Sequence, residues 1–191
     1  FYNKSLKSPS FINCLSQFEN IFIELEYPSK SFKPISDLLI KIKNTINDNI
    51  NIGVVFSSFP ISNDSDCFSS NFSYYTIDSS KLEIPENSFN GCSNLPSIII
   101  PSSIISINSG AFSGCSSLKS FVIPQSVISI GEYAFSECSS LKNIKIPSTV
   151  QFIGNHAFFR CSMLTRVEIP SSLKSIESYA FSECSSLSNI D

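Results

Sequence analysis

Hydrophobic and polar positions recur every 23 residues through the C-terminal part of the chain. Cysteines and phenylalanines keep this spacing, and leucines and prolines follow in the same register. The columns are Cys92, Cys115, Cys138, Cys161 and Cys184; Phe89, Phe112, Phe135, Phe158 and Phe181; Leu95, Leu118, Leu141, Leu164 and Leu187; and Pro101, Pro124, Pro147 and Pro170. Four columns in one register identify an internal repeat.

One repeat unit, residues 118–140, has too few apolar residues to form a core alone. Its apolar columns are Leu118, Phe121, Ile123, Val127, Ile130, Ala134, Phe135 and Cys138. Leu118-x-x-Phe121-x-Ile123 is the LxxLxL strand signature, and Pro124 ends the strand because it has no N–H to donate. The serine-rich stretch that follows is typical of turns. Each unit is therefore predicted to contribute one short strand and a return segment.

Stacking of these units predicts a repeat solenoid. Strands that run in one direction and are separated by long returns pair in parallel, through right-handed connections. The period lies in the 20–29-residue range of leucine-rich repeats, whose units share one continuous core. We predict a right-handed leucine-rich-repeat coil with a parallel concave sheet over residues 66–191, beginning with a degenerate half-repeat near residue 70.

Residues 1–65 do not follow the 23-residue register. Residues 21–27 alternate well enough for a strand, and the apolar residues between Ile35 and Ile46 have helical spacing. Residues 57–70 are rich in Ser, Asn and Asp, which is typical of a connecting loop. Because the end of a solenoid exposes its core, we predict that residues 1–65 form a small α+β N-terminal cap. The alternative is a separate small binding module.

Composition excludes several function classes. The chain has 191 residues with 42% hydrophobic and 15% charged, a balance typical of a folded domain. The net charge is −3 and the 13 Lys and Arg are scattered singly, so the basic patch of a nucleic-acid-binding protein is missing. No run of about 18 apolar residues occurs, so membrane insertion by this segment is not expected.

The cysteine column predicts buried thiols rather than a reactive site. No CxxC motif occurs, and neither His nor carboxylate repeats beside the column, which argues against a metal site. Free cysteine packs as a small hydrophobic residue. Cys14 and Cys67 lie outside the column and are able to pair with each other in an oxidising compartment.

No catalytic or cofactor site is predicted. His156 is the only histidine, its column neighbours are Gly110, Tyr133 and Tyr179, and no GxSxG motif accompanies the many serines. Residues 63–66 look calcium-like but lack the Gly and closing Glu of an EF-hand loop. A carbohydrate-binding or hydrolytic protein would need paired carboxylates and an aromatic platform, which the sequence does not reveal. The prediction is a non-enzymatic protein without a cofactor.

The predicted binding surface is the concave face of the sheet. Side chains alternate across a strand, so if Leu118, Phe121 and Ile123 point inward, Ser120 and Val122 point to the concave face. The same columns along the array are Tyr74, Thr76, Ser97, Ile99, Ser120, Val122, Asn143, Lys145, Arg166 and Glu168. Concave sheets are the usual binding surfaces of solenoids. Two alternatives remain: merely solvated strand residues, or a return-segment surface with Ile105, Ile128, Phe152 and Phe159.

The repeat resembles a known family. The string IPxSVxxIGxxAFxxCxxLxxIxIP, which runs from Ile123-Pro124 to Ile146-Pro147, is similar to the BspA-like, Treponema-type leucine-rich repeats over roughly residues 72–191. The resemblance implies a protein-binding module of a surface-associated, adhesin-like protein, at the cell surface or secreted. An intracellular, cytoplasmic scaffold is the alternative. Lys81, Asp78 and Ser88 depart from the pattern and make the first unit less regular.

Native material would discriminate these two compartments. Glycans at Asn63 or Asn71, both in N-x-S/T patterns, would favour the surface protein, whereas free thiols at Cys14 and Cys67 would favour the scaffold. The chain stops in the strand of a new repeat, after Leu187 and Ile190. We therefore expect a longer natural chain, and self-association or fraying of this one through its open C-terminal end.

Overall fold

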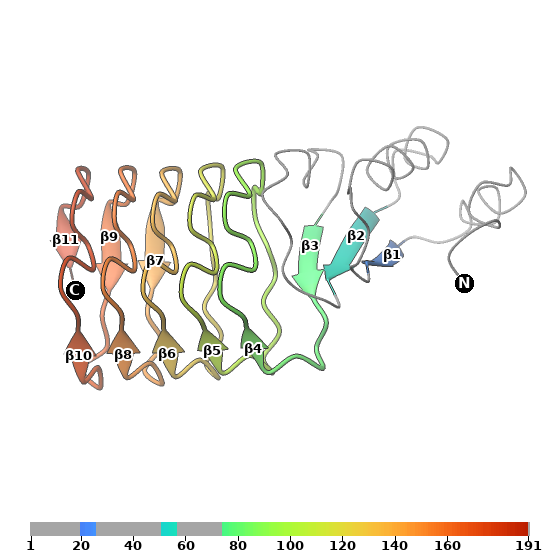
Figure 1. Cartoon of the computed structure of the whole chain (residues 1–191), viewed down its shortest axis with the longest axis horizontal. Coiled ribbons are helices and arrows are strands. Elements are labelled where there is room, and N and C mark those ends of the chain that lie inside the picture. Colours follow the sequence, from blue (N-terminus) through green and yellow to red (C-terminus); the bar gives the residue numbers. More distant parts are fainter. Residues whose placement is uncertain (1–19, 26–50, 57–73, 191) are drawn as a thin grey trace, which may run out of the picture.

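Each 23-residue unit closes one coil, and successive coils stack side by side along a single axis (Figure 1). This computed structural model describes residues 20–25, 51–56 and 74–190. The described residues form parallel strands joined by turns, and each coil contributes its apolar columns to one shared core. The predicted repeat solenoid with parallel strand pairing is therefore confirmed.

The LxxLxL segments form the first set of strands, which comprises β3 (Tyr74–Ile77), β7 (Asn143–Lys145), β9 (Arg166–Glu168) and β11 (Asn189–Ile190). β7 pairs in parallel with β9, and β9 with β11. Between β3 and β7 the pairing is reduced to one bridge, from Thr76 to Ile99.

A second sheet lies on another side of the coils and was not predicted. Its strands are β4 (Glu83–Ile84), β5 (Ser106–Ile107), β6 (Ser129–Ile130), β8 (Phe152–Ile153) and β10 (Ser175–Ile176), all paired in parallel (Figure 1). The prediction of one strand per unit was therefore wrong. In β4, β5, β6 and β8 a polar or exposed residue precedes a buried isoleucine, and two residues are too few for the sequence to show the alternation of a strand.

Two strands extend the β3 sheet toward the N-terminus. β1 (Asn20–Leu25) confirms the strand predicted over 21–27, and it pairs in parallel with β2 (Asn51–Phe56), which pairs with β3. Paired residues are 31 positions apart in the sequence between β1 and β2, and 21 positions apart between β2 and β3. The sheet therefore continues into a region that does not follow the 23-residue period. The predicted helix at 35–46 and loop at 57–70 lie outside the described residues.

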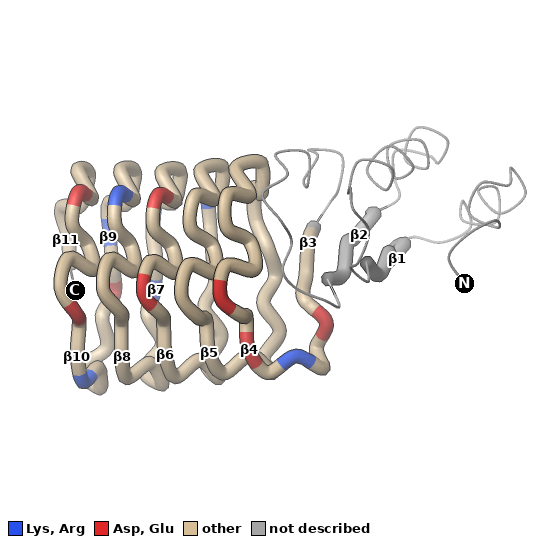
Figure 2. The backbone as a smooth tube through the Cα atoms, in the orientation of Figure 1, with Lys and Arg blue, Asp and Glu red and all other residues tan. Residues whose placement is uncertain are grey.

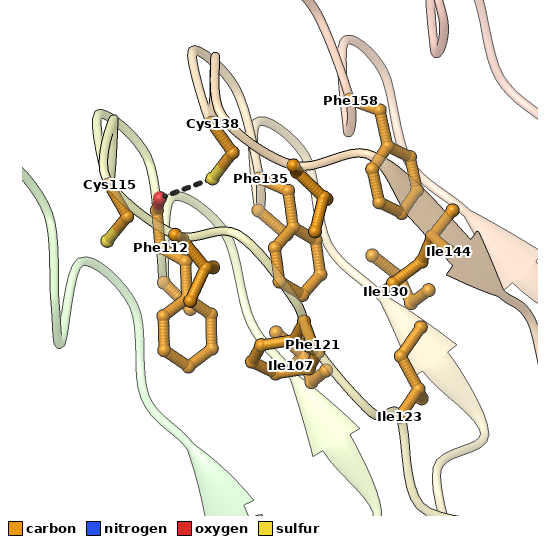
Figure 3. Close-up of a cluster of buried hydrophobic side chains, with 14 of the residues drawn as sticks. Ile107, Phe112, Cys115, Phe121, Ile123, Ile130, Phe135, Cys138, Ile144 and Phe158 are labelled. Atoms are coloured by element: carbon orange, nitrogen blue, oxygen red, sulfur yellow. Dashed lines mark hydrogen bonds between the residues drawn. The ribbon is translucent and has the colours of Figure 1, made fainter. Parts of the chain in front are cut away.

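Stacked phenylalanine rings fill the core (Figure 3). The rings of Phe112 and Phe135 lie 5.4 Å apart and nearly parallel, and Phe135 lies 5.2 Å from Phe158. Phe121 packs edge-on against both Phe112 and Phe135, with centroids 4.9 and 4.7 Å away. Aromatic pairs of this kind add to the stabilisation from burial alone.

The cysteine column lies beside these rings, and its thiols are free, as predicted. Each described thiol from Cys115 onward donates a hydrogen bond of 3.1–3.2 Å to a phenylalanine carbonyl oxygen in the preceding coil. Cys184, in the last coil, is half-buried, whereas the other four are buried. Cys14 and Cys67 lie outside the described residues.

The first unit keeps this regularity despite its departures from the pattern. Ser88 occupies the alanine column and is fully buried, and its hydroxyl donates to the carbonyl oxygen of Pro85 at 2.7 Å. Asp78, in the proline column, accepts from the hydroxyl of Ser80 at 2.6 Å and so forms a turn without proline. Hydrogen bonds to neighbouring residues therefore compensate for the missing alanine and proline.

Candidate binding face

The predicted concave positions lie on the exposed side of β3, β7 and β9 and of the extended segments 97–99 and 120–122. We call this surface the ladder face. Its members in the two middle coils include exposed aliphatic side chains: Val122 is 79% exposed and Ile99 is 55% exposed. Ser120, Asn143, Lys145 and Arg166 are exposed as well, whereas Thr76, Ser97 and Glu168 are half-buried. The side chain of Tyr74 lies outside the described part.

Strand alternation places these side chains outward. In β7, Ile144 is buried between exposed Asn143 and Lys145, and in β9, Val167 is buried between Arg166 and Glu168. Because residue 145 pairs with residue 168, side chains from successive coils lie next to each other across the strands. The ladder face is therefore held by the packed core beneath it.

Three charged groups interact at the C-terminal end of the ladder face. The Lys145 ammonium lies 2.9 Å from Glu168 Oε2, and the Arg166 guanidinium lies 3.7 Å from Glu168 Oε1. The hydrogen bond from Lys145, followed by its charge, lowers the pKa of the Glu168 carboxyl, and Arg166 adds a smaller effect. One carboxylate thus serves two cations, and this group carries one net positive charge.

A shallow groove adjoins these charges. The groove is lined by Gln125, Lys145, Ile146, Pro147, Ser148, Arg166, Glu168, Ile169 and Pro170. The sequence pointed to Lys145, Arg166 and Glu168 but not to Gln125 or the prolines, which enter the groove because strand and turn meet there. The only feature of the sequence that could have indicated these groove residues was the proline column.

The ladder face can therefore offer two kinds of contact in neighbouring coils. Ile99 and Val122 present aliphatic surface, and Lys145 and Arg166 present donors for a carboxylate. A second charged row lies on the turns of the last three coils, where the Arg160 guanidinium pairs with Glu137 at 3.5 Å and Glu183 at 2.8 Å (Figure 2).

The return segments carry a second set of exposed apolar side chains. Leu82, Ile105 and Ile128 share one column and are 62%, 45% and 44% exposed, and Phe152 lies exposed in the next coil. Phe159, expected on this surface, is instead half-buried and packs edge-on against His156. This surface is apolar, and the Lys174 ammonium lies over the Phe152 ring, 5.8 Å from its centroid.

The described residues contain no group of three His, Cys, Asp or Glu side chains placed to hold a metal ion. Within the same residues, no helix is long and apolar enough to cross a membrane.

His156 lies between the rings of Tyr133 and Tyr179, at centroid distances of 4.8 and 5.1 Å. The sequence had shown this column without indicating that its rings stack.

Comparison with known proteins identifies the repeat. The family model described as the BspA type leucine-rich repeat region matches residues 61–188 in six copies. The chain belongs to this family. Its stacked coils and its phenylalanine and cysteine columns are therefore features of a BspA-type leucine-rich-repeat array, and the resemblance inferred from the sequence is confirmed. No curated protein sequence matches the chain.

Solved structures of bacterial leucine-rich-repeat proteins share the fold. A leucine-rich-repeat protein of Treponema pallidum is 27% identical, with a TM-score of 0.59 over 90% of this chain and 63% of that one. A leucine-rich cell surface protein of Faecalibacterium prausnitzii is 25% identical, with a TM-score of 0.58 over 76% and 52%. A Bacteroides ovatus leucine-rich-repeat protein is 26% identical, with a TM-score of 0.58 over 90% and 45%. The chain thus spans between about half and two thirds of their lengths.

Proposed function

We propose that this BspA-type array is a non-enzymatic protein-interaction module that binds its partner on the ladder face. The observation that supports this most is the exposure of Val122 and Ile99, two aliphatic side chains that share one column in neighbouring coils. Lys145 follows Val122 in the same column, one coil further on, and Arg166 lies in the coil after that; both cations can bind carboxylates. The proposed binding residues are those predicted from the sequence: Tyr74, Thr76, Ser97, Ile99, Ser120, Val122, Asn143, Lys145, Arg166 and Glu168.

The rigidity of the sheet favours binding. Lys145 in β7 and Glu168 in β9 are partners in a parallel strand pair, so their backbones are already ordered. Little backbone entropy is therefore lost when a partner binds. The aliphatic end is proposed to supply most of the affinity and the charged end most of the selectivity. Part of the charge is already balanced by Glu168, so an acidic partner must compete with that carboxylate.

We further propose a surface-associated, adhesin-like role for the protein that contains this chain. The support is the similarity to the Faecalibacterium prausnitzii relative, a leucine rich cell surface protein. An intracellular scaffold that uses the same face is the alternative. Protease shaving of intact cells, with a cytosolic marker protein as the control, separates the two: loss of the protein while the marker survives supports the surface role, and its survival supports the scaffold.

Two triple variants test the binding face. The first changes Ile99, Val122 and Arg166 to Ser; the second changes the exposed return-segment residues Leu82, Ile105 and Ile128 to Ser. Each must keep the melting temperature of the parent chain. Partners captured from surface and cytosolic extracts by the parent chain should be lost by the first variant and retained by the second. If only the second variant loses them, the ladder face is not the binding surface.

We also propose that this 191-residue chain self-associates through its C-terminal coil. Ile176 and Ile190 are 45% and 59% exposed, and Cys184 and Leu187 are only partly buried. Sedimentation velocity over a range of protein concentrations, compared with the double variant Ile176→Ser and Ile190→Ser, tests this. A monomer at all concentrations would overturn the proposal.

A further inference from the structure

One column of the turns adopts a left-handed backbone. Asn87, Tyr133, His156 and Tyr179 have φ between 53° and 59°, and Gly110 fills the same position with φ 63°. Non-glycine residues adopt this conformation at a cost of roughly 1 kcal/mol or more, so glycine is the unstrained choice. Aromatic side chains are nevertheless found in three consecutive coils.

These aromatic rings form a continuous stack. Tyr133 and His156 are nearly parallel with centroids 4.8 Å apart, and His156 and Tyr179 follow at 5.1 Å. Backbone hydrogen bonds hold the column: the N–H of Tyr133 donates to Asn155 O at 2.9 Å, and that of His156 donates to Ser178 O at 3.1 Å. The rings are therefore fixed in orientation by the coils that carry them.

The stack ends at Gly110, and this end is open. His156 covers one face of the Tyr133 ring, but Gly110 in the preceding coil has no side chain to cover the other face, and Tyr133 remains 41% exposed. A Cβ atom at Gly110 would lie 2.3 Å from Asn87 Oδ1, so the Asn87 amide occupies the place of the next side chain. The Asn87 amide therefore reaches toward the position beside the Tyr133 ring that Gly110 leaves without a side chain.

A pocket lies at this end of the stack, beside Gly110 and Tyr133. It has a volume of about 330 Å³, and its lining residues are Asn87, Asn90, Ser109, Gly110, Ser113, Glu132 and Tyr133. This volume is at the small end of ligand pockets, which span roughly 300–1,000 Å³. The lining combines one aromatic ring with amides, hydroxyls and a carboxylate, and contains no cation and no aliphatic side chain.

The polar groups of the pocket are available to a ligand. Asn90 Nδ2 donates to Asn87 Oδ1 at 3.1 Å, which orients the Asn87 amide and leaves its NH₂ as a donor. Among the described residues, no hydrogen bond occupies the Glu132 carboxylate or the hydroxyls of Ser109 and Ser113. A ligand with several hydroxyl groups and one apolar face would match this set.

We infer that the pocket between Gly110 and Tyr133 binds a single neutral pyranose sugar. The apolar C–H face of the sugar would lie on the Tyr133 ring, and its hydroxyls would donate to Glu132 and exchange hydrogen bonds with Asn87. Glu132 and the lack of any cation disfavour sugars that carry a carboxylate. This site is separate from the ladder face, and neither proposal depends on the other.

Saturation-transfer difference NMR on the full chain tests the site, with the methyl glycosides of glucose, galactose, mannose and N-acetylglucosamine as probes. We expect millimolar binding of at least one glycoside, with the strongest transfer to the protons of one sugar face. Tyr133→Ala should weaken it about tenfold or more, whereas Tyr133→Phe should stay within about threefold because the ring remains. Absence of binding by all four glycosides overturns the inference.

Tyr179→Ala is the matched control, because Tyr179 has the same backbone conformation and stacks on the same His156 but does not line the pocket. It should leave sugar binding unchanged. Equal loss of binding in Tyr133→Ala and Tyr179→Ala would show that the stack acts only through folding and would overturn the site. Glu132→Gln should weaken binding of the neutral glycoside and relieve the exclusion of glucuronate; preference of the parent chain for glucuronate would also contradict the inference.

Discussion

The thiol of Cys138 donates a hydrogen bond to the carbonyl oxygen of Phe112, 3.2 Å away in the preceding coil (Figure 3). The same bond recurs one coil earlier and one coil later, from Cys115 to Phe89 and from Cys161 to Phe135. A small side chain with a weak donor satisfies a buried carbonyl and still packs against phenylalanine. This explains why cysteine, rather than alanine or serine, occupies the column.

The first prediction concerns thiol reactivity. Burial raises the pKa of the Cys115 and Cys138 thiols far above the ordinary value, so neither forms the reactive thiolate in the native chain. With Cys14 and Cys67 changed to Ser, a thiol reagent at about pH 8 should modify half-buried Cys184 first and the four buried thiols only in denaturant. Mass spectrometry of tryptic peptides identifies the modified residue. Rapid modification of native Cys138 would contradict the burial of the column.

The second prediction concerns the phenylalanine stack. Phe135→Ala removes a ring that contacts Phe112, Phe121 and Phe158, and should lower the free energy of unfolding by about 3–5 kcal/mol. Urea denaturation followed by circular dichroism measures the change. Phe152→Ala, at a 46% exposed position, is the control and should cost less than about 1 kcal/mol. Similar losses from both variants would mean that the stack does not hold the coils together.

The third prediction concerns two glycines with different roles. A Cβ at Gly131 would lie 2.6 Å from the backbone nitrogen of Ser109, so Gly131→Ala must force neighbouring coils apart and should cost about 1–3 kcal/mol or more. At Gly114 a Cβ would meet Gly91 Cα at 3.4 Å, an ordinary contact, and only the positive φ is unfavourable. Gly114→Ala should therefore cost about 1 kcal/mol. Thermal melts of both variants give the order, and the reverse order would contradict it.

The fourth prediction concerns pH. The pKa of Glu168 is lowered by Lys145 from its ordinary value of 4.5, so its ion pairs stabilise the fold at pH values above 4.5. This contribution is lost as pH falls through the lowered pKa. Glu168→Gln should therefore lower the melting temperature slightly at neutral pH, and the difference should vanish in strong acid. Glu137→Gln, which removes the longer 3.5 Å contact to Arg160, should show a smaller difference.

Glu168→Gln also bears on the ladder face. Removing this carboxylate takes away an ion-pair partner that lies 2.9 Å from Lys145 and 3.7 Å from Arg166, and should strengthen binding of an acidic partner. The gain should shrink as salt is added, because exposed charges are screened. Binding by the parent chain and the variant at two salt concentrations measures this. Unchanged affinity at low salt would mean that the partner does not contact these cations.

Much of the fold follows from the repeat itself. A residue that recurs every 23 positions must meet the same environment in every coil, so the columns headed by Phe89, Cys92 and Leu95 identify the core and the stacking direction without coordinates. The exposure of Val122 follows as well, because it lies between two buried residues, Phe121 and Ile123, in a strand signature. These features depend only on spacing and alternation, which a sequence displays directly.

Only the tertiary structure decided how neighbouring columns meet. The sequence by itself determined the period, the core columns and the family, because these depend on which residues stack along the axis. It did not reveal the second sheet, since each of its strands is two residues long. The interaction of Lys145 and Arg166 with Glu168 does follow from the sequence, because residues 145 and 168 share a column one coil apart. The open ring face of Tyr133, by contrast, depends on the absence of a side chain in another coil, at Gly110. Such contacts are set by the lateral distances and side-chain directions of the folded coil, which a one-dimensional period does not contain.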